Sequence, residues 1–524
     1  MASTPSPSAP PRIVAVVDMG ASAIRLLVAE LLPDGSTRLL EEASRGALLG
    51  KDTFARGRLS SATIQSTLKI LEGFRAIIDG YGPAHCRAVT TSAVREAENR
   101  DAFLDRVRLR TGLEFEIIDG PEENRLTWLA VREALRRHPA PVPDPALLME
   151  IGGGSADLSF LKDGEPVRSG TYPLGSIRLR QQLSSWRGSL DHGVRLLVRT
   201  IQNVVEDVQR DMPLQEARQV IALGGDVGFA ADRILGEEGS RPGVRTIPAA
   251  AFDAFCEEIV RDDVEGLVER YGLQQAGAET LVPALLTCRE LLRRTRSDTL
   301  LVPDASLRAG LLLDMARSET GQGSAEELRR LVLASAESLG EKYSWDAAHG
   351  RHVASLAAGL FDQLSEEHGL GAHHRLLLEV AALLHDIGVF VGRRAHHKHS
   401  QYILSVSDVF GLSREDMVFV AVVARYHRRA FPQKSHPTYV ALDREARVAV
   451  LKLAAILRLA NALDAERRQK VTSVRLTRTE RAWRLEASGA GDLAMERLAC
   501  DARSDLFADV YGTPIAFRQA EETA

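Results

Sequence analysis

Glu150-Ile151-Gly152-Gly153-Gly154-Ser155 decides the fold, because an earlier segment of the chain repeats its layout. In each copy an apolar run is followed by an acidic residue, then by glycine and a hydroxyl. The earlier copy is Asp18-Met19-Gly20-Ala21-Ser22. Each loop leads into a predicted β-ribbon, at residues 24–40 and at 157–172. This arrangement, occurring twice, predicts two related lobes that face each other across a cleft.

The two loops indicate what such a cleft would bind. Glycine lets the backbone approach a phosphate closely, with its N–H groups directed at the oxygens. Two acids at the same mouth, Asp18 and Glu150, can hold a divalent cation that neutralises the phosphate. Acids at strand ends can also simply cap loops or form salt bridges. Two of them in matching contexts favour the cation or phosphate role, so a phosphorylated substrate is expected.

Composition limits the classes of protein that fit. The 524 residues are 45% hydrophobic and 26% charged, which is typical of a globular protein of several domains. The net charge of −5 gives no global basic field for a nucleic acid or an acidic membrane, so neither is an expected partner. No apolar run reaches the roughly 18 residues of a membrane helix. The 4 cysteines form no CxxC pair, which indicates a reducing compartment, and the cytoplasm is the expected location.

The order of predicted elements divides the chain into five segments. Residues 1–11 are rich in Ser and Pro and predict a disordered tail, whereas residues 12–130 and 131–317 alternate strand and helix signals and are expected to form the two lobes. After a polar linker, residues 325–469 are helical throughout and contain 11 of the 14 histidines. Alternation returns in residues 470–524, which predicts a small α+β domain.

Two further polar segments follow buried strands of the first lobe. Residues 90–99 place three hydroxyls before Arg95. Its guanidinium could bind a phosphate through two hydrogen bonds or pair with a surface acid. Glu122 and Glu123 follow Gly120-Pro121, where a carboxylate could act as a general base on water or only favour a helix dipole. Spacing alone leaves both interpretations of each segment open.

Four motifs, in this order and spacing, resemble the exopolyphosphatase / guanosine pentaphosphate phosphohydrolase (Ppx/GppA) family. They read IVAVVDMGASAIRLLVAE, AVTTSAVREAENRDAFLDRVRLRTGLEFEIIDGPEENRL, LLMEIGGGSADLSF and PLGSIRL. The similarity covers about residues 12–310, and the later parts resemble the longer members of the family. It implies an α/β protein with two actin-like (ribonuclease H-like) lobes, an all-helical HD-like domain and a small α+β C-terminal domain.

The resemblance implies a metal-dependent phosphohydrolase that cleaves the terminal phosphoanhydride of polyphosphate or of guanosine pentaphosphate. By motif position, Glu123 matches the catalytic base, and Asp18 and Glu150 match the acids of the metal loops, with Mg²⁺ or another divalent cation expected. A homodimer is also implied. The implied phosphate-binding residues are Gly20, Ser22, Arg95, Gly152, Gly153, Gly154, Ser155 and Gly225.

Several positions in the expected site depart from the family pattern. Ala21 and Ala23 replace residues with hydroxyl or amide groups in the first loop, and Glu150 stands where the family usually has Asp. Asn124 replaces Ala after the base, and Asp226 replaces Thr in a third Gly-rich loop. These departures keep open a second function, a non-enzymatic sensor of polyphosphate or alarmone. A phosphotransferase of the sugar- or acetate-kinase kind is disfavoured, because residues 90–99 resemble the phosphohydrolases.

The histidines of the helical segment form another candidate site. His385-Asp386 ends an apolar helix, with His352 upstream and His427 downstream, which resembles an HD-domain metal site. The last acid of such a site is expected near residues 458–461, where the chain has the weaker ligand Asn461. Both a degenerate HD scaffold and a second phosphohydrolase site therefore remain open. Basic residues nearby could form a substrate channel or an ordinary solvated surface; they are Arg393, Arg394, Lys398, Arg428 and Arg429.

Overall fold

The computed structural model describes residues 12–32, 36–182, 189–236, 243–320, 325–428 and 430–520. The predicted tail at 1–11 and the turn predicted at 33–35 lie outside the described residues. The chain forms two compact units, Met1–Ala325 and Glu326–Ala524.

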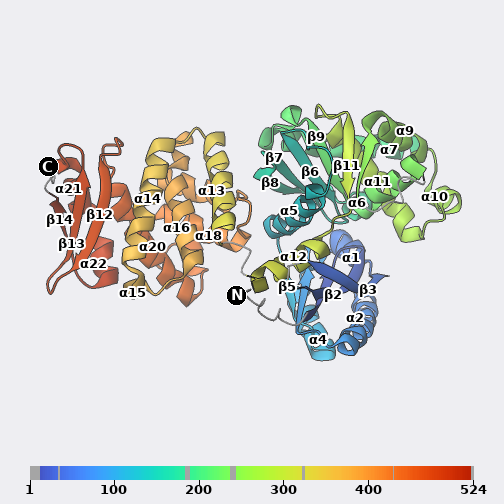
Figure 1. Cartoon of the computed structure of the whole chain (residues 1–524), viewed down its shortest axis with the longest axis horizontal. Helices are drawn as coiled ribbons and strands as arrows, with labels where there is room; N and C mark the ends of the chain where they lie inside the picture. The colour runs from blue at the N-terminus through green and yellow to red at the C-terminus, as the bar shows by residue number, and fades with distance from the viewer. Residues whose placement is uncertain are drawn as a thin grey trace, which may run out of the picture. The chain divides into compact units, whose positions relative to one another are not determined.

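The first unit contains two sheets, and each is built around the repeated strand, loop and ribbon (Figure 1). The sheet of the first lobe has the order β3-β2-β1-β4-β5, with β1 antiparallel to β2 and parallel to β4. Its strands are β1 (Arg12–Met19), β2 (Ala23–Leu31), β3 (Thr37–Gly46), β4 (His85–Thr90) and β5 (Phe115–Ile117). Buried side chains dominate β1, which explains its apolar run.

The sheet of the second lobe repeats this pattern in the order β10-β11-β9-β6-β7-β8. Here β6 is antiparallel to β7 and parallel to β9, as β1 is to β2 and β4. The strands are β6 (Ala146–Ile151), β7 (Ala156–Lys162), β8 (Glu165–Tyr172), β9 (Gln219–Leu223), β10 (Val244–Pro248) and β11 (Thr299–Pro303). The prediction of two related lobes is confirmed.

Helices cover both sheets of this unit. Those of the first segment are α1 (Leu49–Arg56), α2 (Ser61–Tyr81), α3 (Ser92–Arg95), α4 (Arg100–Thr111) and α5 (Gly120–Arg136). The later ones are α6 (Ser176–Gln182), α7 (Leu190–Asp211), α8 (Gly225–Leu235), α9 (Ala249–Ile259), α10 (Val264–Tyr271), α11 (Gln275–Leu292) and α12 (Leu307–Thr320). Asp119 caps α5 by accepting a hydrogen bond from the backbone N–H of Glu122, and Pro121 occupies the first turn.

Two of these helices tie the lobes together (Figure 1). Leu311 of α12 shares a buried cluster with Val14 of β1 and Leu126 of α5. Farther along α5, the Trp128 indole donates to the carbonyl of Gly164 in the second lobe at 3.1 Å. Helix α12, which the sequence prediction places in the second lobe at 131–317, thus returns to pack on the first sheet. A composition pattern shows where a helix lies in the sequence but not which sheet it covers.

Gly310 marks the crossing of α12 and α5. A Cβ atom at this position would lie 2.1 Å from the carbonyl oxygen of Leu126, which is rigid backbone. Gly310→Ala is therefore expected to lower the free energy of unfolding by roughly 1–3 kcal/mol in urea denaturation. In the control Gly73→Ala, the added Cβ meets nothing within 4 Å. This control should gain roughly 0.5–1 kcal/mol. Equal stability of the two variants would contradict the close crossing.

The second unit is helical and then ends in a small sheet. Its helices are α13 (Ala325–Lys342), α14 (Ala347–Gln363), α15 (Ser365–His368), α16 (Ala372–Leu384), α17 (His396–Ser405), α18 (Arg414–Arg425), α19 (Pro437–Val440), α20 (Arg444–Ala462), α21 (Ala494–Arg503) and α22 (Asp505–Tyr511). The strands β12 (Val471–Arg478), β13 (Trp483–Gly489) and β14 (Ile515–Gln519) form one sheet in that order. One buried cluster runs from Val332 in α13 to Tyr511 in α22, so sheet and helices share a core.

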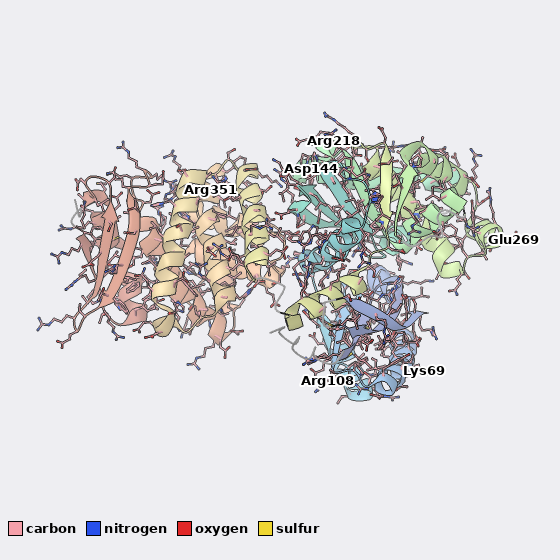
Figure 2. The ribbon with its side chains drawn as sticks, viewed as in Figure 1. Lys69, Arg108, Asp144, Arg218, Glu269 and Arg351 are labelled. Atoms are coloured by element: carbon pink, nitrogen blue, oxygen red, sulfur yellow. The ribbon has the colours of Figure 1, made fainter. Side chains whose placement is uncertain are left out.

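Most charged side chains lie where solvent can reach them. Those labelled in Figure 2, such as Lys69 on α2 and Glu269 on α10, are exposed and project from the outside of the fold. Among the described helices, none combines the length and the apolar character needed to cross a bilayer. Charged groups that are buried instead are therefore informative, and two of them, Asp18 and Asp157, lie near the ends of β1 and β6.

Candidate active site

The loops after β1 and β6 open into one cavity of about 750 Å³ in the first unit. The cavity brings together Asp18, Glu123 and Glu150, which are far apart in the sequence. All predicted phosphate-binding residues except Arg95 also line it, namely Gly20, Ser22, Gly152, Gly153, Gly154, Ser155 and Gly225. The two halves of the internal repeat therefore meet at a single hollow.

A further acid, Asp157, belongs to this group. It lies opposite Glu150 in the antiparallel pair of β6 and β7, so both side chains project from the same face of the sheet. Asp157 accepts hydrogen bonds from Ser155 Oγ at 3.1 Å and from Thr171 Oγ1 at 2.6 Å. Burial raises its pKa above the ordinary value against the effect of these bonds.

Glu150 carries the clearest electrostatic signature of the site. Burial raises its pKa from 4.5 to about 7, and the neighbouring charges of Asp157 and Asp18 act in the same direction. A hydrogen bond of 2.7 Å from Thr127 Oγ1 on α5 opposes this rise. The carboxylate has too few positive partners for its degree of burial, which is a feature of functional sites.

Glu123 is held in place by Arg95. The guanidinium Nη1 donates to Glu123 Oε1 at 2.8 Å and also to the backbone carbonyl of Ile118. Burial, and after it the nearby charge of Asp157, raises the pKa of Glu123 well above its ordinary value, although Arg95 opposes this. A buried carboxylate with a raised pKa in a cleft is suited to accept a proton. The structure thus pairs Arg95 with Glu123, an acid that lines the cavity, and not with a surface acid; Arg95 itself does not line the cavity.

The backbone of the second loop, which lines the cavity, has two amides without a protein acceptor among the described residues. The N–H groups of Ser176 and Ile177 in α6 donate to the carbonyls of Gly152 and Gly153 at 2.9 Å each. A trans peptide directs its N–H opposite to its C=O, so the amides of Gly153 and Gly154 point away from α6. Within the described residues these two amides donate to no protein acceptor. They are free to bind the oxygens of an anion.

Two family models match the chain. The one described as "Ppx/GppA phosphatase family" matches residues 30–319, and "Ppx/GppA phosphatase, domain III" matches residues 332–502. The chain belongs to the Ppx/GppA phosphatase family. The predicted family and fold class, with two actin-like lobes, a helical domain and a small final α+β domain, are confirmed.

Individual relatives carry both names of the family. The chain is 25% identical over 463 residues to the guanosine-5'-triphosphate,3'-diphosphate pyrophosphatase of Vibrio parahaemolyticus, which covers 86% of each chain. It is 27% identical over 315 residues to exopolyphosphatase 1 of Mycobacterium bovis, covering 58% of this chain and 88% of that protein. The solved exopolyphosphatase of Cytophaga hutchinsonii has a TM-score of 0.54 at 21% identity, covering 59% of this chain and 98% of that one, and shows the shared fold.

The departures from the Ppx/GppA pattern lie in and around this cavity. Ala21 is buried, and a Cβ at Gly153 would lie 3.1 Å from its methyl group, so the two loops touch there. Ala23 contributes its carbonyl, which accepts from the Gly20 N–H at 3.0 Å. Asp226 accepts a hydrogen bond from Thr280 at 3.3 Å, and burial raises its pKa to about 6. The first loop is therefore built by backbone contacts that do not need the missing hydroxyls.

Sequence reasoning missed three charged residues of this Ppx/GppA site. Asp157 follows Glu150 by seven positions, and Arg25 follows Asp18 by the same number. In both cases the two residues lie directly opposite each other on neighbouring antiparallel strands. Arg25 Nη1 lies 3.5 Å from Asp18 Oδ2. Strand alternation within the repeat was the signal that could have found both. Arg308 at the start of α12 also lines the cavity. No local sequence pattern around it indicates a role in the site.

The ligand type of the acids in this cavity suits the divalent cation that the sequence predicts. Asp18, Glu150 and Asp157 offer only oxygen ligands, which Mg²⁺ prefers. Burial raises the pKa of all three carboxyl groups, and repulsion by the charges of Asp157 and Asp18 raises that of Glu150 further. Arg25 is the one basic side chain within ion-pair distance of Asp18 among the described residues. A divalent cation would relieve this repulsion.

Added Mg²⁺ is expected to stabilise the protein more at about pH 8 than at about pH 6. The folded-state pKa of Glu150 is raised from 4.5 to about 7. The stability that its protonated carboxyl group contributes is therefore fully present below pH 4.5 and is lost as the pH rises through about 7. Mg²⁺ binds the ionised acids and restores stability where they are ionised, whereas protons compete with it at the lower pH. Thermal unfolding with and without Mg²⁺ at both pH values measures this. A larger Mg²⁺ effect at the lower pH would contradict the assignment.

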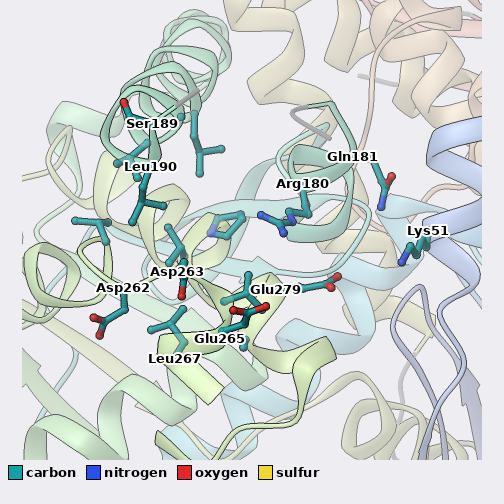
Figure 3. Close-up of a pocket in the computed structure, with 18 residues that line it drawn as sticks. Lys51, Arg180, Gln181, Ser189, Leu190, Asp262, Asp263, Glu265, Leu267 and Glu279 are labelled. Carbon is teal, nitrogen blue, oxygen red and sulfur yellow. The ribbon is translucent and has the colours of Figure 1, made fainter. Parts of the chain in front are cut away.

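Another cavity in the same unit is less suitable for a polyanion. It measures about 640 Å³ and is lined by residues of α1, α6, α7, α10 and α11 (Figure 3). Arg180 and Lys51 contribute positive charge. The acids Asp262, Asp263, Glu265 and Glu279 outnumber them. No glycine loop lines this hollow, so the cavity between the twin loops is the better candidate.

The second unit rearranges the expected histidine site. His385, Asp386 and His427 come together, but His352 does not join them; His349, one turn earlier on α14, does. The final acid is Asp464, beyond the end of α20, and its Oδ2 lies 2.8 Å from His349 Nδ1. The basic residues named with this site are exposed where the structure describes them, and Arg429 lies outside the described residues.

Proposed function

We propose that the protein is a Mg²⁺-dependent exopolyphosphatase-type hydrolase that releases terminal phosphate from polyphosphate, guanosine pentaphosphate or both. The observation that carries this proposal is the cavity in which Glu123 meets Asp18, Glu150 and Asp157 beside free glycine amides. Relatives named for each substrate support the reaction class. The proposal places the activity in the cytoplasm, in a homodimer, without a nucleic-acid or membrane partner.

Binding of the substrate relies on backbone and charge together. The N–H groups of Gly153 and Gly154 hold oxygens of the terminal phosphoryl group, and the hydroxyl of Ser22 and the loop at Gly225 border the same hollow. Arg25 and Arg308 line the cavity and offset part of the negative charge. Asp18, Glu150 and Asp157 would hold Mg²⁺, which when bound neutralises charge on the phosphates.

Glu123 performs the proton transfer. Its carboxylate takes a proton from a water molecule whose oxygen attacks the terminal phosphorus. The bond between that phosphorus and the bridging oxygen breaks, and the bridging oxygen keeps the electron pair on the shortened chain. Arg95 positions the Glu123 carboxylate through the 2.8 Å hydrogen bond, and its positive charge lowers the Glu123 pKa against the effect of burial. Both substrates present the same terminal phosphoanhydride to these groups.

A turnover assay on the two substrates side by side tests the proposal. Orthophosphate release that depends on Mg²⁺ is expected from at least one of them, and the ratio of kcat/KM values assigns the preferred substrate. Release from neither substrate, with binding of both retained, would favour the sensor instead. The sensor remains the second candidate because Ala21 and Ala23 lack the side-chain groups usual in the first loop.

A further inference from the structure

We propose that the second unit contains a binuclear centre for divalent first-row transition ions, separate from the Mg²⁺ cleft. Its ligands come from helices α14 and α17 and from the segments that follow α16 and α18. Two groups of ligands share Asp386, and within each group the ligand atoms lie within 4.8 Å of one another. One group is His349, His385 and Asp386; the other is Asp386, His396 and His427.

Hydrogen bonds fix which nitrogen of each ring is available. Nδ1 of His385 lies 2.7 Å from the carbonyl of Ala382, and Nδ1 of His427 lies 2.7 Å from the carbonyl of Ala424. Nδ1 of His396 likewise lies 3.0 Å from a backbone carbonyl. Since a carbonyl can only accept, each Nδ1 carries the proton, and a neutral ring then has its lone pair on Nε2. Three Nε2 lone pairs are thus prepared for a ligand.

These Nε2 atoms converge on one carboxylate oxygen. Asp386 Oδ1 lies 3.7 Å from His385 Nε2, 3.0 Å from His396 Nε2 and 3.4 Å from His427 Nε2. The Nε2 atoms of His396 and His427 are themselves 3.1 Å apart. Acceptors that face one another at these distances repel unless a cation lies between them. Asp386 Oδ2 is already bonded to Arg467, so this acid cannot satisfy every ring alone.

Burial makes protons a poor substitute for metal ions. His349 and His427 are 1% exposed and His385 is 0% exposed, so charging several rings together would place positive charges in the core of the unit. Nε2 of His349 and of His385 is buried without a hydrogen-bond partner in the part of the chain that the structure describes. Unsatisfied buried nitrogens of this kind need an explanation, and a metal ion supplies one.

Asp464 completes the arrangement as a positioning residue. Its Oδ2 accepts from His349 Nδ1 at 2.8 Å, and its Oδ1 accepts from the backbone N–H of Gln469 at 2.8 Å. A carboxylate bonded to one ring nitrogen orients the other toward a metal and raises its basicity. His349 therefore presents Nε2 to the first group in the way the backbone carbonyls prepare the other three rings.

The ligand types indicate which ions the centre takes. Four imidazoles and one bridging carboxylate form a nitrogen-rich set that suits Zn²⁺, Fe²⁺, Co²⁺ or Mn²⁺. The cleft of the first unit offers oxygen ligands only and suits Mg²⁺. One chain would then hold two classes of metal ion in different units, so either assignment can be tested without the other.

Metal analysis of the full-length chain tests the inference. The purified protein is stripped with a chelator, incubated with Zn²⁺ or Mn²⁺ in the presence of excess Mg²⁺, freed of unbound metal and analysed by mass spectrometry. We expect about two transition ions per chain, one for each ligand group. Asp386→Asn, which weakens the shared ligand, should lose both ions, and His396→Ala should lose one.

Control variants separate the centre from general effects. His373→Ala removes an exposed histidine paired with Asp416 at 2.7 Å and should keep both ions. Glu150→Gln in the first unit should also keep both, even if turnover is lost. Asp464→Asn should bind roughly 10- to 100-fold more weakly. Circular dichroism confirms that each variant is folded. A wild-type chain that retains no transition ion, or Asp386→Asn with an unchanged metal content, would overturn the inference.

Discussion

Glu123→Gln is expected to reduce Mg²⁺-dependent release of orthophosphate by roughly 100- to 10,000-fold. The amide has nearly the shape of the carboxylate and can still accept a hydrogen bond from Arg95, so the site should keep its geometry. The variant site lacks the carboxylate that accepts the proton from water. The measurement is kcat on polyphosphate with saturating Mg²⁺. Binding of the substrate should persist, because Glu123 contributes no contact with the phosphate chain in the proposed mechanism.

The neighbouring acid provides a matched control for this experiment. Glu122 precedes Glu123 on α5, but its carboxylate pairs with Arg125 at 2.7 Å and does not line the cavity. Glu122→Gln should therefore keep turnover within a few fold of the wild type. Equal losses in both variants would show that any change in this turn of α5 disturbs the enzyme, and would remove the case for Glu123 as the base.

Glu150→Gln is expected to lower turnover and to raise stability. Loss of one preorganised charged group of the site should reduce kcat by roughly 100- to 1,000-fold. In the absence of Mg²⁺ the same change removes a carboxylate that burial disfavours. The rise of its pKa from 4.5 to about 7 corresponds to a cost of about 3 kcal/mol above that pH. Thr127 can still donate its hydrogen bond to the amide oxygen.

Activity and unfolding assays on the same preparation measure the opposite movement of these two properties. An exposed acid serves as the control: Asp79 on α2 is 57% exposed and forms a surface pair with Arg75. Asp79→Asn should change the free energy of unfolding by less than about 0.5 kcal/mol and leave kcat unchanged. If Glu150→Gln lost stability along with activity, Glu150 would be a structural acid and its metal role would be excluded.

The sequence was sufficient for the elements built from repeated local patterns. Asp18 and Glu150 each follow an apolar run and precede glycine, and this periodicity located both strands and both loops. Arg25 and Asp157 each lie seven residues after one of these acids, on the strand that follows the loop. Antiparallel pairing of the two strands places each of them opposite its acid. These two residues were within reach of sequence reasoning and required only the register of the ribbons.

Other features depend on packing between distant segments. Arg308 reaches the cleft because α12 crosses back to the first sheet, and the sequence near it carries no sign of that path. Arg95 could have met a phosphate or an acid, and only the position of α5 placed Glu123 beside it.

The histidine site shows the limit of helical spacing. His349 and His352 are three residues apart on α14, so periodicity alone permits either to face the other ligands. The structure selects His349. The final acid lies at Asp464, two residues beyond the end of α20, where the phase of the helix no longer predicts direction. The expectation based on Asn461 therefore described a weaker site than the one the fold assembles.

Hydrolysis in water enriched with heavy oxygen tests the central claim most directly. If water activated by Glu123 attacks the terminal phosphorus in the cleft of Asp18 and Glu150, each orthophosphate released from polyphosphate carries one heavy oxygen atom, and Glu123→Gln releases almost none. Mass spectrometry of the product reads this outcome. Orthophosphate without the label, or wild-type release no faster than that of the variant, would contradict the account.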